Sequence, residues 1–220
     1  MRRLNYLHYT VLIILIPIVI VILSSNLVLR FQETYVFHFN DSQVVNKLYT
    51  DIAPTEFADE IASYWSSFSK DEFQIYEENA NFKDELFDKK EVQVMGMLKK
   101  IINIQLLAGL LFSIIIFFMY RKIYMNKHHA ALHRLGYISG IITLAAVVLV
   151  NIVLRIGAVR SGLYNLLIGV ELSKKCALVT LLGGSFYKVF LIFFSITAVA
   201  LLGLLFYINY NLTKDKRLFY

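Results

Sequence analysis

The chain has 220 residues, of which 58% are hydrophobic, and it carries a formal net charge of +6. A hydrophobic share this high, with the charges confined to a few segments, excludes a disordered chain and is typical of an integral membrane protein. The single cysteine, Cys176, excludes an intrachain disulfide.

Four segments are long and apolar enough to cross a bilayer, which takes about 18 to 20 residues without charge. They are residues 4–29, 101–120, 135–154 and 189–212. The first is too long for the apolar region of a signal peptide and is followed by no small-x-small cleavage site, so we expect it to be a retained span. The third begins with Gly136 and Gly140, a small-xxx-small pattern that predicts a close contact with another helix.

The distribution of lysine and arginine predicts the orientation, because basic residues concentrate in short cytoplasmic loops. They cluster at the N-terminus, in the 121–134 loop and in the 213–220 tail, and an even number of spans puts these three on one side. We therefore expect a multi-pass plasma-membrane protein with both termini in the cytoplasm. Residues 30–100, with 14 acidic and 8 basic residues, and residues 155–188 would lie outside. The positive charge then reflects topology and indicates no nucleic-acid partner.

Residues 30–100 are predicted to form a small extracytoplasmic helical cap. Asp41 is suited to begin one helix, and Pro54 to begin a second. The second helix has a single apolar stripe, which consists of Phe57, Ile61, Tyr64, Trp65 and Phe68. The stripe either packs against the rest of the cap or lies on the bilayer surface, and the acidic opposite face favours packing.

The stretch LFDKKEVQVMGMLKKIINIQ, residues 86–105, joins this cap to the second span. Asp88 and Glu91 have the spacing of a capping box at a helix N-terminus. Val92, Met95 and Leu98 then continue an apolar face into the span without a Gly-Pro break. The pattern predicts one continuous helix that leads from the cap into the membrane.

Residues 155–188 are half apolar, yet they contain no uncharged run of spanning length. A re-entrant or interfacial segment fits this composition, because irregular backbone near lipid must be covered by protein or lie at the surface. We expect this segment and the cap to roof a cavity open to the outer leaflet. The predicted fold is thus all-α and polytopic, with four transmembrane helices, a helical cap and a re-entrant or interfacial outer loop.

The spans contain no Asp, Glu, Lys or Arg, which argues against an ion or proton transporter. Cys176 follows two lysines, which favour a thiolate, but a small apolar filler is the simpler interpretation. His129 and His133 have the i, i+4 spacing of metal ligands, yet they fall in a basic cytoplasmic loop and are interpreted as ordinary loop residues. No metal and no cofactor is therefore expected.

The layout resembles a family of small integral membrane proteins of Gram-positive bacteria, the lipoprotein intramolecular transacylases. The resemblance rests on the acidic cap sequence FSKDEFQIYEENANFKDELFDKKEVQVM, the short basic loop and the semi-apolar outer loop that ends in LVTLLGGSFY. It implies an enzyme of the outer face that moves an acyl chain from the diacylglyceryl group of a lipoprotein to the amino group of the N-terminal cysteine.

The motifs of that family are where this chain departs from it. The first, E-x-x-H-M-x-D-V, matches EVQVMGML with Glu91 on the glutamate, Met95 on the methionine and Val94 in place of the histidine. The second motif contains another histidine, and counting back from LLGGSFY puts Ser161 near its place. Acyl transfer to an amine needs a base and an acid, which imidazole supplies and valine does not.

Two functions from different classes remain open on this basis. The favoured one is a non-catalytic relative that binds a membrane lipid, a lipidated protein or another membrane subunit at the outer leaflet. The alternative is a divergent lipoprotein acyltransferase that uses other groups, such as Glu91, Lys99, Lys188 or Tyr164, or a His38 brought in by the cap. No residue is assigned as catalytic. The residues expected at the outer cavity are Glu91, Val94, Lys99, Ser161 and Tyr164.

Overall fold

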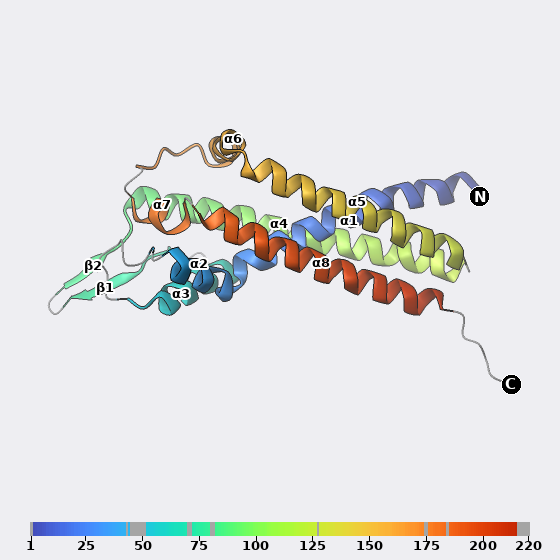
Figure 1. The fold of residues 1–220 in the computed structure, drawn as a ribbon, viewed down its shortest axis with the longest axis horizontal. Helices are drawn as coiled ribbons and strands as arrows, with labels where there is room; N and C mark the ends of the chain where they lie inside the picture. The colour runs from blue at the N-terminus through green and yellow to red at the C-terminus, as the bar shows by residue number, and fades with distance from the viewer. Residues whose placement is uncertain are drawn as a thin grey trace. The chain divides into compact units, whose positions relative to one another are not determined.

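The structure is a computed structural model that describes residues 2–42, 44, 52–69, 72–79, 82–126, 128–173, 176–183 and 185–214. Its elements in chain order are α1 Arg2–Arg30, α2 Gln32–Ser42, α3 Pro54–Ser66, β1 Tyr76–Asn79, β2 Phe82–Glu85, α4 Lys89–Met125, α5 His129–Arg155, α6 Gly157–Leu167, α7 Ala177–Leu182 and α8 Phe186–Thr213 (Figure 1). The all-α prediction is confirmed. The antiparallel hairpin of β1 and β2 is a small addition that the sequence analysis did not anticipate.

Four of the helices are long and apolar enough to span a membrane. They are α4, α5, α8 and the part of α1 from His8 to Arg30. Each overlaps one predicted span, so the protein is an integral membrane protein with four spans. Helix α4 has 37 residues and runs without interruption from Lys89, in the charged stretch, to Met125. The predicted continuous helix at the junction is therefore present.

The chain divides into two compact units. The first, which we call the membrane unit, comprises Met1–Ser25, Leu106–Asn151 and Ser195–Tyr220. The second, the cap unit, comprises Asn26–Gln105 and Ile152–Phe194. All five residues that were expected at an outer cavity belong to the cap unit.

Within the membrane unit, the two glycines of α5 contact α8. A Cβ atom at Gly136 would overlap the side-chain amide of Asn209, and one at Gly140 would lie 2.5 Å from the ring of Phe206. Asn209 is buried, and its amide oxygen accepts a hydrogen bond from the hydroxyl of Tyr120 on α4. The predicted small-xxx-small contact is confirmed, because only glycine leaves room for these two side chains.

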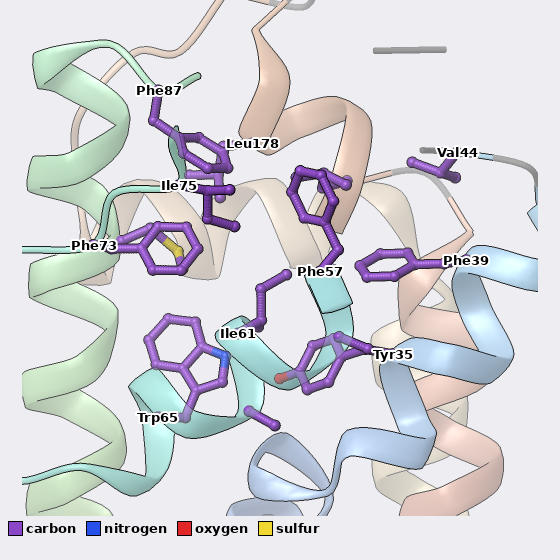
Figure 2. Packing of buried hydrophobic residues seen from close by; sticks show 14 of the residues in the cluster. Tyr35, Phe39, Val44, Phe57, Ile61, Trp65, Phe73, Ile75, Phe87 and Leu178 are labelled. Carbon is purple, nitrogen blue, oxygen red and sulfur yellow. The ribbon is translucent and has the colours of Figure 1, made fainter. Parts of the chain in front are cut away.

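Within the cap unit, α3 packs its apolar stripe into a hydrophobic core. Phe57, Ile61 and Trp65 are all at most 2% exposed, and they face Tyr35 and Phe39 of α2 (Figure 2). The packing interpretation of the stripe is thus confirmed for these residues. Phe68, which follows the end of α3, is 64% exposed and does not join the core.

The prediction that a helix begins at Asp41 is wrong. Asp41 lies in the last turn of α2, which begins nine residues earlier at Gln32. Only a break at Phe31 separates α2 from α1, and there the hydroxyl of Thr34 donates a hydrogen bond to the Val28 carbonyl (3.0 Å). Tyr35 and Phe39, at helical spacing, bury the apolar side of α2. Most of the expected helix, residues 45–51, lies outside the described residues.

The described part of the segment between the third and fourth spans contains two short helices, α6 and α7. Helix α6 buries none of its side chains, and Leu163, Leu166 and Leu167 are exposed on it. An apolar helix face without protein cover is typical of a helix that lies at a bilayer surface. Helix α7, in contrast, buries Leu178 and Leu181 in the core of the cap unit.

Candidate functional site

The N-terminus of α4 is fixed by the predicted capping box. The Asp88 carboxylate accepts hydrogen bonds from the backbone N–H groups of Lys90 (2.7 Å) and Glu91 (2.8 Å). In return, Oε2 of Glu91 accepts one from the N–H of Asp88 (2.8 Å). Both side chains thus satisfy donors that every helix start leaves open, and this fixes where α4 begins.

The second carboxylate oxygen of Glu91 binds the loop between the third and fourth spans. Oε1 accepts a hydrogen bond of 2.7 Å from the backbone N–H of Leu178, and Glu91 is only 3% exposed. Each oxygen of this buried carboxylate therefore holds a backbone donor. An acceptor engaged in this way is a structural link between α4 and α7, and the arrangement does not suit a proton shuttle.

Val94 and Lys99 lie further along α4, and both are buried. Val94 is 1% exposed within the hydrophobic core and offers no group for proton transfer. Lys99 is 6% exposed, and its ammonium donates a hydrogen bond to the hydroxyl of Ser67 (2.8 Å). The same ammonium lies 3.9 Å from the ring centroid of Tyr64, a cation–π contact.

Ser161 and Tyr164 lie on α6, and their hydroxyls bond to nearby backbone. Ser161 is exposed and donates to the carbonyl of Gly157 (3.0 Å), one turn earlier. Tyr164 donates to the carbonyl of Val170 (2.8 Å). Burial raises the pKa of Tyr164, and the nearby Cys176 raises it further. The Tyr164 hydroxyl therefore stays protonated at neutral pH.

Cys176 is the residue that neighbours both Glu91 and Tyr164. Burial is the main cause that raises the pKa of the Cys176 thiol, and the carboxylates of Glu91 and Asp88 raise it as well. The N–H of Val179 lowers it, but does not reverse the shift. A thiol held in its neutral form is a weak nucleophile, which agrees with the structural interpretation of this cysteine.

A groove of about 1520 Å³ lies between the end of α3 and the first turns of α4. The described residues that line it are Tyr64, Phe68, Ser69, Glu72, Gln74, Lys89, Val92, Gln93, Gly96, Met97, Lys99, Lys100 and Asn103. Of the five residues expected at an outer cavity, only Lys99 lines this groove. The structure thus divides the expected set: Glu91 and Val94 support the core, and Ser161 and Tyr164 belong to α6.

The comparisons with known proteins agree with this architecture. The family model of the lipoprotein intramolecular transacylase Lit matches residues 10–158, well over half of the chain. The chain belongs to the Lit family. Lit of Bacillus cereus with a histidine-to-alanine substitution has the same fold, with a TM-score of 0.73 at 15% identity, over 98% of this chain and 96% of that one.

Two further structures of Bacillus cereus Lit are similar. A variant with the histidine changed to arginine gives a TM-score of 0.69 at 16% identity, over 98% of this chain and 94% of that one. A second crystal form gives 0.67 at 16% identity, over 99% of both chains. The search of curated proteins gave no match. At these identities the structures show a common fold and no more.

Among the histidines of this Lit-family chain, His38 lies buried in the cap unit. His38, on α2, is 1% exposed, and its Nε2 lies 3.0 Å from the carbonyl oxygen of Leu181. A carbonyl only accepts, so Nε2 carries the proton of this bond. The ring also packs edge-on against Phe186, so His38 is part of the core of the cap unit. Among the described residues, no group of three or more His, Cys, Asp or Glu could hold a metal ion.

A polar cluster in the cap unit, formed by Asn26, Arg30 and Asn103, was not anticipated from this Lit-family sequence. The guanidinium of Arg30 donates to the side-chain oxygens of Asn26 (2.8 Å) and Asn103 (2.7 Å). The amide of Asn26 donates to the carbonyl of Ile102 (2.6 Å). The i, i+4 spacing of Asn26 and Arg30 at the end of an apolar run was the available signal. This spacing does not indicate that Asn103 on α4 is their partner.

Proposed function

We propose that this Lit-family protein binds the lipid end of a lipidated protein at the outer leaflet without carrying out acyl transfer. The observation that carries the proposal is the environment of Val94, the residue that replaces the family's motif histidine in our alignment. It is 1% exposed and packed in the core of the cap unit. We expect such an apolar, packed environment at this position in a family member that keeps the fold without the acyl-transfer chemistry.

The neighbouring groups support the same conclusion. Transfer of an acyl chain to an ammonium group requires a base for the amine proton and an acid for the departing glycerol oxygen. Both oxygens of Glu91 accept bonds from the backbone, and Lys99 donates to Ser67 against the face of Tyr64. Cys176 is held as a neutral thiol. These groups fill structural roles.

The alternative, a divergent acyltransferase, is favoured by membership of a family named for its transacylase activity. A mass-spectrometric experiment separates the two. The chain is expressed in a host whose lipoproteins are all diacylated, with an active Lit enzyme as the positive control. We expect no N-acylated lyso-form peptides from this chain. Their appearance would establish catalysis, and alanine variants of His38, Lys99, Lys188 and Tyr164 would then identify the base.

Binding itself is tested with one lipoprotein in two forms. The diacylated form and a form whose lipidated cysteine is changed to serine are passed over the immobilised, detergent-solubilised protein. We expect retention of the diacylated form only, because a lipid end contributes apolar surface that the unmodified form lacks. Equal retention of both forms, or of neither, contradicts the proposal.

The proposal also requires the cap unit to lie outside, with both termini in the cytoplasm. The Lys/Arg distribution supports this orientation. Single cysteines at the exposed positions Ser66 and Asn126, in a Cys176→Ser background, test it with an impermeant thiol reagent on intact cells. We expect Ser66→Cys to react and Asn126→Cys to react only after permeabilisation. The opposite pattern contradicts the orientation.

A further inference from the structure

We propose that the groove between α3 and α4 is a binding site for an anionic phospholipid, with the phosphate held by the basic side chains near Lys100. The site does not depend on the proposed lipoprotein binding.

The charge of the groove favours an anionic ligand. Among the described residues that line it, Lys89, Lys99 and Lys100 face a single acidic residue, Glu72. The α4 wall also includes Gly96, where an added Cβ would meet no atom within 4 Å. The groove is therefore wide at this point. The α4 wall is one face of the helix, on which Lys89, Gly96, Lys100 and Asn103 recur at helical spacing.

A fourth cation adjoins the membrane end of the groove. Arg30 lies 2.7 Å from the side-chain oxygen of Asn103 and 5.7 Å from the ring centroid of Phe68, and both of these residues line the groove. Its position is fixed by the bond to Asn26 as well. Lys100 and Lys89, in contrast, are exposed. A fixed guanidinium beside exposed ammonium groups is an arrangement suited to a phosphate.

The depth of these cations matches a lipid headgroup. Arg30 is the last residue of the first span, and Lys100 directly precedes the uncharged run that begins at Ile101. Below Lys100, the same face of α4 presents Ile104, which is 66% exposed. The acyl chains of a lipid can lie against this apolar end of the face while the phosphate stays at the level of the cations.

The same features disfavour the end of a lipidated protein as the occupant. A free N-terminal amine is cationic and would be repelled by three lysines, and a diacylglyceryl group has no phosphate for them to bind. A zwitterionic phospholipid carries a phosphate, but its choline ammonium cancels the charge. The geometry therefore points to a phospholipid with net negative charge, such as phosphatidylglycerol.

Native mass spectrometry of the full chain in detergent tests the site. Phosphatidylglycerol, phosphatidylcholine and inorganic phosphate are titrated separately, and the apparent Kd is read from the bound fraction. We expect binding of phosphatidylglycerol that is at least about tenfold tighter than that of phosphatidylcholine, from the contribution of each cation near an anionic group. Equal binding of the two lipids, or binding of inorganic phosphate as tight as that of phosphatidylglycerol, overturns the proposal.

Two variants locate the binding. The double variant Lys89→Gln/Lys100→Gln removes exposed charge from the groove, and Gly96→Leu fills the wide part of the groove without a change of charge. Each should weaken phosphatidylglycerol binding by about tenfold or more, while Lys188→Gln, an exposed lysine of the cap unit outside the groove, should not. Leucine favours helix more than glycine, so Gly96→Leu should fold, and the Tm without lipid checks this.

If both groove variants fold and still bind phosphatidylglycerol as tightly as the wild-type chain, the lipid binds elsewhere and the assignment is overturned. The lipoprotein retention experiment is repeated on the same two variants. Retention that persists while phosphatidylglycerol binding is lost leaves the proposed function intact and confirms a separate lipid site. If the wild-type chain binds phosphatidylglycerol but does not retain the diacylated lipoprotein, only the proposed function is contradicted.

Discussion

Glu91 and Leu178 are 87 positions apart in the chain, and the carboxylate of the first accepts a 2.7 Å hydrogen bond from the backbone N–H of the second. The same carboxylate caps α4 through the N–H of Asp88. One buried side chain thus fixes the start of a membrane-spanning helix and the position of the loop before the last span. These two hydrogen bonds give Glu91 a structural part in the cap unit.

Loss of this carboxylate should be costly. Glu91→Ala leaves two backbone donors without an acceptor, and we expect it to lower the free energy of unfolding by about 2 to 4 kcal/mol. Glu91→Gln keeps one acceptor oxygen and should cost about half as much. Glu60→Ala, on the exposed side of α3, is the control and should have little effect. Denaturant titration in detergent measures all three, and equal stabilities of Glu91→Ala and Glu60→Ala would refute the link.

Val94 should behave as a core residue and nothing more. Val94→Ala removes two methyl groups from a site that is 1% exposed, and we expect a loss of about 1 kcal/mol or more in the free energy of unfolding. The acylation state of cellular lipoproteins should not change, because valine takes part in no proton transfer. A change in the N-terminal peptides, measured by mass spectrometry, would instead show that this position acts on the chemistry.

The contact of α5 with α8 should depend on glycine at one position and not at another. Gly136→Ala drives a methyl group into Asn209, so we expect a loss of about 1 to 3 kcal/mol. Gly203→Ala, on α8, has no atom within 4 Å of the added Cβ and should be neutral or stabilising, since alanine favours helix. Thermal unfolding in one detergent compares the two. A Gly136→Ala protein as stable as Gly203→Ala would contradict the packing.

The reactivity of Cys176 should follow its raised pKa. Burial, together with the Glu91 carboxylate, raises the pKa of the Cys176 thiol above that of an exposed cysteine, so its thiolate forms only at higher pH. The rate of labelling by iodoacetamide should reach half of its plateau at a higher pH for Cys176 than for a single cysteine at the exposed position Ser66 in a Cys176→Ser background. Glu91→Gln removes one cause of the shift and should move the curve to lower pH. A plateau below pH 8.5 in the wild-type chain would refute the shift.

The four spans were predictable from the sequence, because a bilayer imposes one requirement on every spanning helix. Each must present about 20 residues without charge, and this is a local property of the chain. The capping box of Asp88 and Glu91 and the apolar stripe of α3 were equally local, since their partners are three or four residues away. The contact of Gly136 with another helix was predicted for the same reason, although its partner Asn209 was not.

The tertiary structure decided which residues share a site, because a side chain's partners across the fold leave no periodic trace in the sequence. Nothing local shows that Glu91 meets Leu178, or that Arg30 binds Asn103. The expected set therefore separated into core, α6 and groove. The groove also brought in Phe68, which had been assigned to the apolar stripe of α3, and Gly96, to which no role had been assigned. Apolar patterning determined the elements, and long-range packing and buried hydrogen bonds determined where their chemistry lies.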